Sequence, residues 1–134
     1  MSNPEVIQPE GWLAPRGYSN GISATGRTVS VAGQIGWNPR TGAIESADFA
    51  AQAAQALRNV VAVLAAAGAR PEHLVRLTWF ITDRAAYMSA RGDIGDAYRE
   101  IVGRHFPAMS VVVVHGLIES DADVEIEATA IVPA

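Results

Sequence analysis

The chain has 134 residues, no cysteine and a formal net charge of −4, with 49% hydrophobic and only 18% charged residues. This length predicts a single domain, residues 1–134, and the apolar content predicts an oligomer that buries part of the surface between subunits. The acidic balance argues against nucleic acid as a partner, and the lack of cysteine excludes disulfide and thiolate chemistry.

The first 16 residues contain three prolines and are predicted to form an extended segment, with a short strand near Val6–Gln8. Prolines and acids stand where a secretory signal would have a basic flank and an apolar core. The most apolar stretch, residues 50–67, is interrupted by polar side chains, so we expect no membrane partner and a cytoplasmic location.

Two alternating runs, residues 19–25 and 28–35, flank Gly26 and Arg27 and predict a β-hairpin. Gly33 and Gly36 lie at the end of the second run. Glycine at such positions allows a bulge or a close backbone approach.

Residues 47–67 give the clearest helical pattern. Ser46 or Asp48 can cap its beginning, and Gly68 stands where a left-handed residue ends many helices. One stripe at helical spacing is predicted to face the core, formed by Phe49, Ala53, Leu57, Val60 and Leu64.

The β-branched and aromatic residues of 74–82 predict a strand, after which Thr82 or Asp83 begins a helical turn. A second helix is expected over residues 89–102. The run of four valines within residues 110–115 predicts a strand buried on both faces.

Residues 123–132 alternate strictly, so Val124 and Ile126 point to one face of a strand and Glu125 and Glu127 to the other. The elements then follow the order β-β-α-β-α-β-β. We expect an α+β fold in which two helices cover one face of a single mixed β-sheet and other subunits cover the opposite face.

Four sequence blocks occur in an order that resembles the RidA family, also called YjgF or L-PSP. They are Y-S-N at 18–20, A-G-Q-I-G-W-N-P-x-T-G at 32–42, F-P-A-M at 106–109 and V-E-I-E-A-T-A at 124–130. The resemblance implies a chorismate-mutase-like fold and a homotrimer with a small-metabolite pocket at each subunit interface. It also implies cofactor-free hydrolysis of enamines and imines, such as 2-aminoacrylate, to a keto acid and ammonia.

The resemblance assigns site residues position by position. Glu125 corresponds to the glutamate that helps to activate water, Tyr18 to the pocket tyrosine, and Gly33 to the pocket glycine. The position after the P-A pair, where the family has an arginine that binds the substrate carboxylate, is Met109 in this chain. Gly95, three residues before Tyr98, stands where deaminating members have an asparagine.

Methionine offers a carboxylate none of the charge-assisted hydrogen bonds that an arginine fork supplies. We therefore expect a more apolar pocket, lined by Met109, Tyr98, Trp79 and Trp37, and a ligand other than the usual 2-imino acid. Arg104 or Arg91 is a candidate to replace the missing charge.

Other interpretations of these residues stay open. Glu125 serves either the pocket or an ion pair between subunits, and the two tryptophans are as well suited to a core or an interface. Of the three histidines, His105 lies nearest the pocket blocks. No pair of histidines has ligand spacing, so no metal site is expected.

Two functions compete, and a third, the ribonuclease or translation inhibitor of the family's older label, ranks last because the chain is acidic and has no basic patch. The first is hydrolysis of an enamine or imine in an altered, more apolar pocket between subunits. The alternative is a non-catalytic trimer that binds an apolar metabolite or a protein partner.

Overall fold

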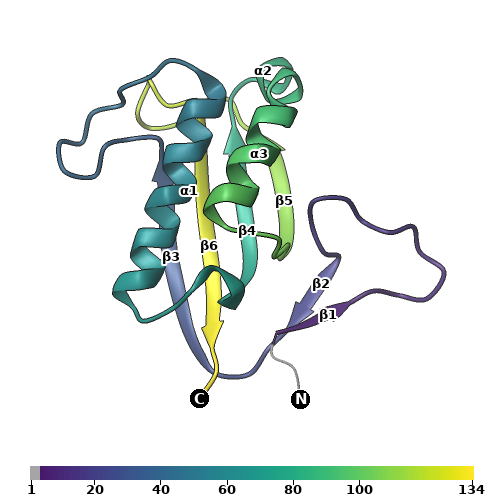
Figure 1. Cartoon of the computed structure of the whole chain (residues 1–134). Helices are drawn as coiled ribbons and strands as arrows, with labels where there is room; N and C mark the ends of the chain where they lie inside the picture. Colours follow the sequence, from purple (N-terminus) through teal and green to yellow (C-terminus); the bar gives the residue numbers. More distant parts are fainter. Residues whose placement is uncertain (1–3) are drawn as a thin grey trace.

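The computed structural model of the protein describes residues 4–134 as two β-sheets and three α-helices (Figure 1). The elements in chain order are β1 (Glu5–Ile7), β2 (Gly21–Ser23), β3 (Arg27–Ile35), α1 (Phe49–Ala66), a 3₁₀ turn (Pro71–His73), β4 (Leu74–Ile81), α2 (Arg84–Ser89), α3 (Arg91–Ile101), β5 (Ala108–Val113) and β6 (Val124–Val132). The short strand expected near residue 6 is β1. Residues 1–3 of the expected extended segment lie outside the described part of the chain.

The main sheet has the strand order β3-β6-β4-β5 and is mixed. β6 is antiparallel to both β3 and β4, whereas β4 and β5 are parallel. Helices α1 and α3 lie on the same face of this sheet (Figure 1). The α+β fold, the mixed sheet and the one-sided helical cover are therefore confirmed, and the expected order appears as β2-β3-α1-β4-α3-β5-β6.

The predicted hairpin over residues 19–35 is wrong. β2 pairs with β1 in a separate two-stranded sheet, while β3 pairs with β6 from Arg27 to Ile35. Gly26 has φ +151°, and a Cβ atom at that position would lie 2.7 Å from the carbonyl carbon of Val132. The glycine therefore serves a close approach to the end of β6 and does not form a two-residue turn.

Helix α1 begins and ends where the sequence predicts. The Asp48 side chain accepts a hydrogen bond from the Ala51 backbone N–H at 3.0 Å, and Gly68 follows the helix with φ +74°. The expected stripe from Phe49 to Leu64 is buried against the sheet. By length and composition α1 could also cross a membrane, but its buried stripe makes it the core helix of this fold.

Replacing the cap residue tests this start of α1. Asp48→Ala removes the acceptor of the Ala51 N–H and is expected to lower the free energy of unfolding by about 1 kcal/mol. Urea denaturation followed by circular dichroism measures the loss. Asp48→Asn is the matched control, because asparagine caps as well as aspartate; equal destabilisation by both variants would contradict the capping role.

Gln52, on α1 and 1% exposed, holds the chain just before β6 in place. Its Nε2 donates to the backbone oxygens of Ser46 and Asp121, and its Oε1 accepts from the Asp123 N–H at 2.8 Å. These bonds fix residue 123 next to the first residue of β6. Because a slip of one residue would exchange the two faces of a strand, they help to set which side chains of β6 face outward.

The expectation that residues 110–115 are buried on both faces is wrong for this chain. Val111, Val112 and Val113 are 36%, 41% and 56% exposed. β5 is the edge strand of the main sheet, where only β4 pairs with it along its length. The apolar run therefore reflects an exposed valine edge on the isolated chain.

Candidate functional site

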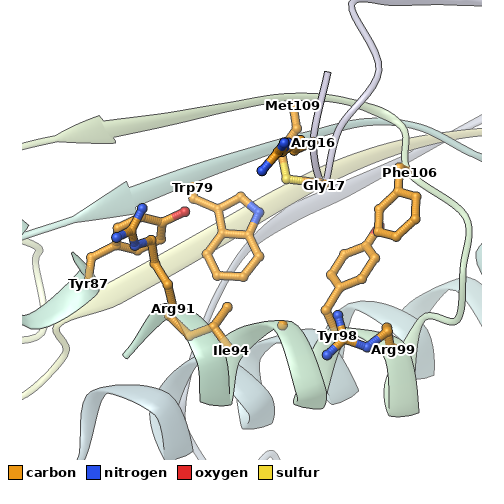
Figure 2. Close-up of a pocket in the computed structure, with 11 residues that line it drawn as sticks. Arg16, Gly17, Trp79, Tyr87, Arg91, Ile94, Tyr98, Arg99, Phe106 and Met109 are labelled. Carbon is orange, nitrogen blue, oxygen red and sulfur yellow. The ribbon is translucent and has the colours of Figure 1, made fainter. Parts of the chain in front are cut away.

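A cavity of about 320 Å³ opens on the helical side of the main sheet, between β4, β5 and α3. Figure 2 shows the residues that line it. They are Arg16, Gly17, Trp79, Tyr87, Arg91, Ile94, Gly95, Tyr98, Arg99, Phe106 and Met109. Three predicted pocket residues, Trp79, Tyr98 and Met109, therefore lie together, and the volume is in the range of small-molecule sites.

Tyr98 and Phe106 form one wall of this cavity. Their rings stack with centroids 5.6 Å apart and planes 12° from parallel (Figure 2). The Tyr98 hydroxyl donates to the backbone oxygen of His105 at 2.6 Å. Burial raises the pKa of the Tyr98 phenol well above its ordinary value, so the phenol stays neutral and acts as a fixed donor.

His105 joins this wall to the start of β4. Its Nε2 lies 2.6 Å from the backbone oxygen of Leu74, and its own backbone oxygen accepts from Tyr98. The histidine that the sequence places nearest the pocket thus braces the loop behind the cavity. Because His105 does not line the cavity, its ring is poorly placed for proton transfer to a molecule bound there.

The cavity lining contains three arginines and no acid, although the chain as a whole carries a charge of −4. Arg99 is paired with Asp96 at 2.6 Å. The Nε of Arg91 donates to the backbone oxygen of Met88 at 3.2 Å. Arg104, the other arginine expected to replace the missing charge, is exposed and does not line the cavity.

Glu125 and Gly33 lie in contact with each other on the face of the sheet that carries no helix. Glu125 pairs with Ile35 of β3 and Phe80 of β4, and a bulge in β3 between Val31 and Gln34 brings Gly33 to it. A Cβ atom at position 33 would lie 2.7 Å from the carboxyl carbon of Glu125 and would collide with its carboxylate oxygen. The glycine therefore makes the space that the Glu125 carboxylate occupies.

The two groups of predicted site residues lie on opposite faces of one sheet. Met109 packs against the core under the helices, as do Val124 and Ile126, the neighbours of Glu125 in β6. Since alternate residues of a strand point to opposite faces, Glu125 points away from the cavity of its own chain. Within one chain the glutamate and the cavity cannot act on one molecule.

The remaining predicted residues lie outside the cavity. Tyr18 is 41% exposed and follows Gly17, which does line the cavity. Trp37 follows β3, where its indole N–H donates to Gln34 Oε1 at 3.4 Å and its backbone oxygen accepts from Asn59. Within residues 4–134, no cluster of three or more acidic or histidine side chains could hold a metal ion.

The sequence pattern of the family described as Endoribonuclease L-PSP matches residues 12–132. The chain belongs to this family. It is 36% identical over 127 residues to a RutC family protein of Pyrococcus horikoshii, spanning 94% of this chain and 96% of that one. It is 37% identical over 117 residues to the 2-iminobutanoate/2-iminopropanoate deaminase of Escherichia coli, covering 85% of this chain and 86% of the deaminase.

Solved structures of the L-PSP family agree with this fold. A Yersinia pestis protein of unknown function from the conserved Rid family superposes with a TM-score of 0.85 at 32% identity, covering 98% of this chain and all of that one. Escherichia coli TdcF, solved with bound serine, gives a TM-score of 0.68 at 32% identity and covers 96% and 98% of the two chains. The resemblance of the sequence to the RidA, YjgF or L-PSP family is confirmed.

Two arginines of the cavity, Arg16 and Arg99, were not predicted from the sequence. The signal for Arg99 lies in α3, where five lining residues recur at spacings of three and one, namely Arg91, Ile94, Gly95, Tyr98 and Arg99. Such spacing places them on one face of a helix. Arg16 follows Pro15 at a bend outside the helices and strands, where no periodic pattern indicates a direction.

Proposed function

We propose that the protein hydrolyses a small imine or enamine to a carbonyl compound and ammonia, without a cofactor, in a pocket shared by two copies of the chain. One copy supplies the cavity beside Met109, and the next supplies Glu125. The observation that carries the proposal is the Glu125 carboxylate. It is half-buried on Gly33, and no other side chain of residues 4–134 forms a hydrogen bond or an ion pair with it.

The chemistry requires one proton acceptor and a bound water. Glu125 accepts a proton as the water oxygen adds to the carbon of the C=N bond, and the imine nitrogen gains a proton to give an amino alcohol. The C–N bond then breaks, ammonia leaves, and loss of the hydroxyl proton forms the C=O bond. An enamine enters the same sequence after protonation at carbon. Water and imine are consumed, and carbonyl compound and ammonia are produced.

The arrangement of the chain supports a shared site. The cavity and Glu125 face away from each other in one chain, so a second copy is needed to bring a glutamate to each cavity. The exposed valine edge of β5 supplies apolar surface for such contacts. The assembly that we propose is a cytoplasmic homotrimer, the form that the family resemblance implies.

The similarity to 2-iminobutanoate/2-iminopropanoate deaminases sets the first experiment. An amino acid oxidase generates 2-imino acids in the presence of the purified protein, and formation of the keto acid is followed against a buffer blank. Several side-chain sizes are compared, because Met109 stands in place of the arginine. Keto-acid formation no faster than in buffer for every imine would overturn the proposal.

A non-catalytic binding protein is the second candidate, and Met109 is the observation that favours it. The family resemblance places a substrate-binding arginine at this position, and a protein that has lost it can retain a pocket without the reaction. A ligand that binds in the cavity but is released unchanged would establish this function instead.

Replacing Gly33 tests the position of the glutamate. Gly33→Ala places a methyl group where the Glu125 carboxylate lies, and the flexible glutamate must move aside. We expect imine hydrolysis to fall about tenfold or more, since small displacements of a reacting group are costly. Steady-state kinetics measures the change. Gly116→Ala is the control, because a Cβ atom there meets nothing within 4 Å; equal activities in the two variants would argue against the proposed placement.

A further inference from the structure

The cavity is more positively charged than the apolar pocket that Met109 alone predicts. Position 109 offers no positive charge, yet Arg16, Arg91 and Arg99 surround the same space without an acid in the lining. Cationic side chains gathered at a cavity with apolar walls raise the positive potential inside it. This arrangement selects an anionic ligand, even though the position that holds the anion in relatives has become apolar.

Arg91 is the arginine best arranged to bind an anion. The bond from its Nε to the backbone oxygen of Met88 fixes the direction of the guanidinium plane and leaves both terminal nitrogens available. Arg99 is occupied by Asp96, whereas no carboxylate of residues 4–134 forms an ion pair with Arg91 or Arg16. Two free N–H groups in one plane match the two oxygens of a carboxylate.

The indole of Trp79 adds a donor on the floor of the cavity. Trp79 is 2% exposed, and its Nε1 is the one buried side-chain nitrogen or oxygen in residues 4–134 that has no hydrogen-bond partner. Figure 2 shows this nitrogen on the side of the ring toward Gly17. A buried donor without an acceptor costs about 1–3 kcal/mol. An acceptor atom of a ligand that reaches this nitrogen would relieve that cost.

The size and walls of the cavity define the rest of the ligand. Its volume of about 320 Å³ is on the order of ten times the ~30 Å³ share of one water molecule in the liquid. A three- or four-carbon acid would leave much of this space unfilled. Trp79, Ile94 and Phe106 offer an apolar surface for the remainder.

We propose that Arg91, assisted by Arg16, binds the carboxylate of the substrate in place of residue 109, and that the substrate is a 2-imino acid with a bulky apolar side chain. This inference takes the reaction from the proposed function. It concerns binding of the substrate carboxylate, which is measured without turnover. In this arrangement the substrate carboxylate lies beside α3 and the N-terminal segment, and the apolar side chain of the substrate packs against the cavity wall around Trp79.

The test compares an acid with its neutral ester in a direct binding assay. Isothermal titration calorimetry measures 4-methyl-2-oxopentanoate, its methyl ester and the smaller acid 2-oxopropanoate against the purified protein. We expect the larger acid to bind most tightly, and added salt to weaken binding of the acids but not of the ester. Arg91→Gln should weaken binding of the larger acid about tenfold or more, Arg16→Gln by less, and Arg91→Lys should retain part of it.

Arg58→Gln is the matched control. Arg58 is an exposed arginine on α1 outside the cavity, so its loss removes the same charge and should leave binding unchanged. Equal affinities for acid and ester, equal effects of Arg91→Gln and Arg58→Gln, or no saturable binding of the acids below about 10 mM would each overturn the inference. Titration and imine hydrolysis, both measured on the unsubstituted protein, separate the two proposals. Carboxylate binding without imine hydrolysis in that protein would overturn the proposed reaction alone, and imine hydrolysis that does not depend on Arg91 would overturn the proposed recognition alone.

Discussion

Glu125→Gln is expected to lower the turnover of imine hydrolysis by at least about a hundredfold, while the affinity for a 2-oxo acid changes by less than about twofold. Loss of a positioned general base typically costs 10²–10⁴ in rate. Glutamine has the shape of glutamate and fits the space that Gly33 leaves, but its amide does not accept the proton of the attacking water. The variant therefore removes the chemistry and keeps the fold.

Glu127→Gln is the matched control for this experiment. Glu127 lies two residues further along β6 on the same helix-free face, beside Thr78 of β4, and is more exposed than Glu125. The Glu127→Gln variant loses the same charge from the same face of the sheet, and we expect its turnover to be unchanged. Full activity of Glu125→Gln, or an equal loss in both variants, would show that Glu125 is not the proton acceptor.

Met109→Arg is expected to raise kcat/KM for the small substrate 2-iminopropanoate about a hundredfold. Residue 109 lies on the cavity wall, and an arginine there adds a charge-assisted pair of hydrogen bonds to the substrate carboxylate. The gain is large for 2-iminopropanoate because this small acid does not fill the cavity beside Arg91. Steady-state kinetics with 2-imino acids of increasing side-chain size measures the effect. The largest gain should occur with the smallest acid, because the longer side chain at position 109 also narrows the cavity.

Met109→Gln is the control for length and polarity, since glutamine resembles methionine in size and carries no charge. It should behave as the original protein toward every acid. Equal gains in the two variants would mean that polarity, and not charge, limits the small substrates. No gain in Met109→Arg would mean that residue 109 does not face the substrate carboxylate.

Local patterns in the sequence were sufficient for most of the fold. The apolar stripe from Phe49 to Leu64 predicts the buried face of α1, and the alternation of residues 124–132 predicts the buried face of β6. Both predicted faces are buried in the structure. Strand partners are not a local property. The run before Gly26 alternates as a hairpin strand would, yet it pairs with β1, and β3 pairs with a strand almost one hundred residues later.

Burial of β5 shows the same limit. A run of valines predicts an apolar environment, but it does not state whether the same chain or another one provides it. In the isolated chain these residues are at an edge of the sheet and are exposed. A run of apolar residues is thus easily interpreted as burial within a subunit even where the chain itself does not cover it.

The candidate site was predictable in its parts. Gly33 and Glu125, 92 positions apart in the sequence, are in contact, and Trp79, Tyr98 and Met109 share one cavity. Their separation on two faces of the sheet was not predicted, because it depends on the pairing of β6 between β3 and β4. Of the three arginines that line the cavity, Arg16 was missed because it lies at a bend outside the helices and strands.

Met109 has a consequence at the level of the gene. The single codon for methionine, AUG, differs by one base from AGG, a codon for arginine. The side chain at this place on the cavity wall can therefore change between a thioether and a guanidinium by one point mutation. If the charge on α3 selects bulky acids, as we propose, the substrate preference of this scaffold lies one nucleotide from a different preference.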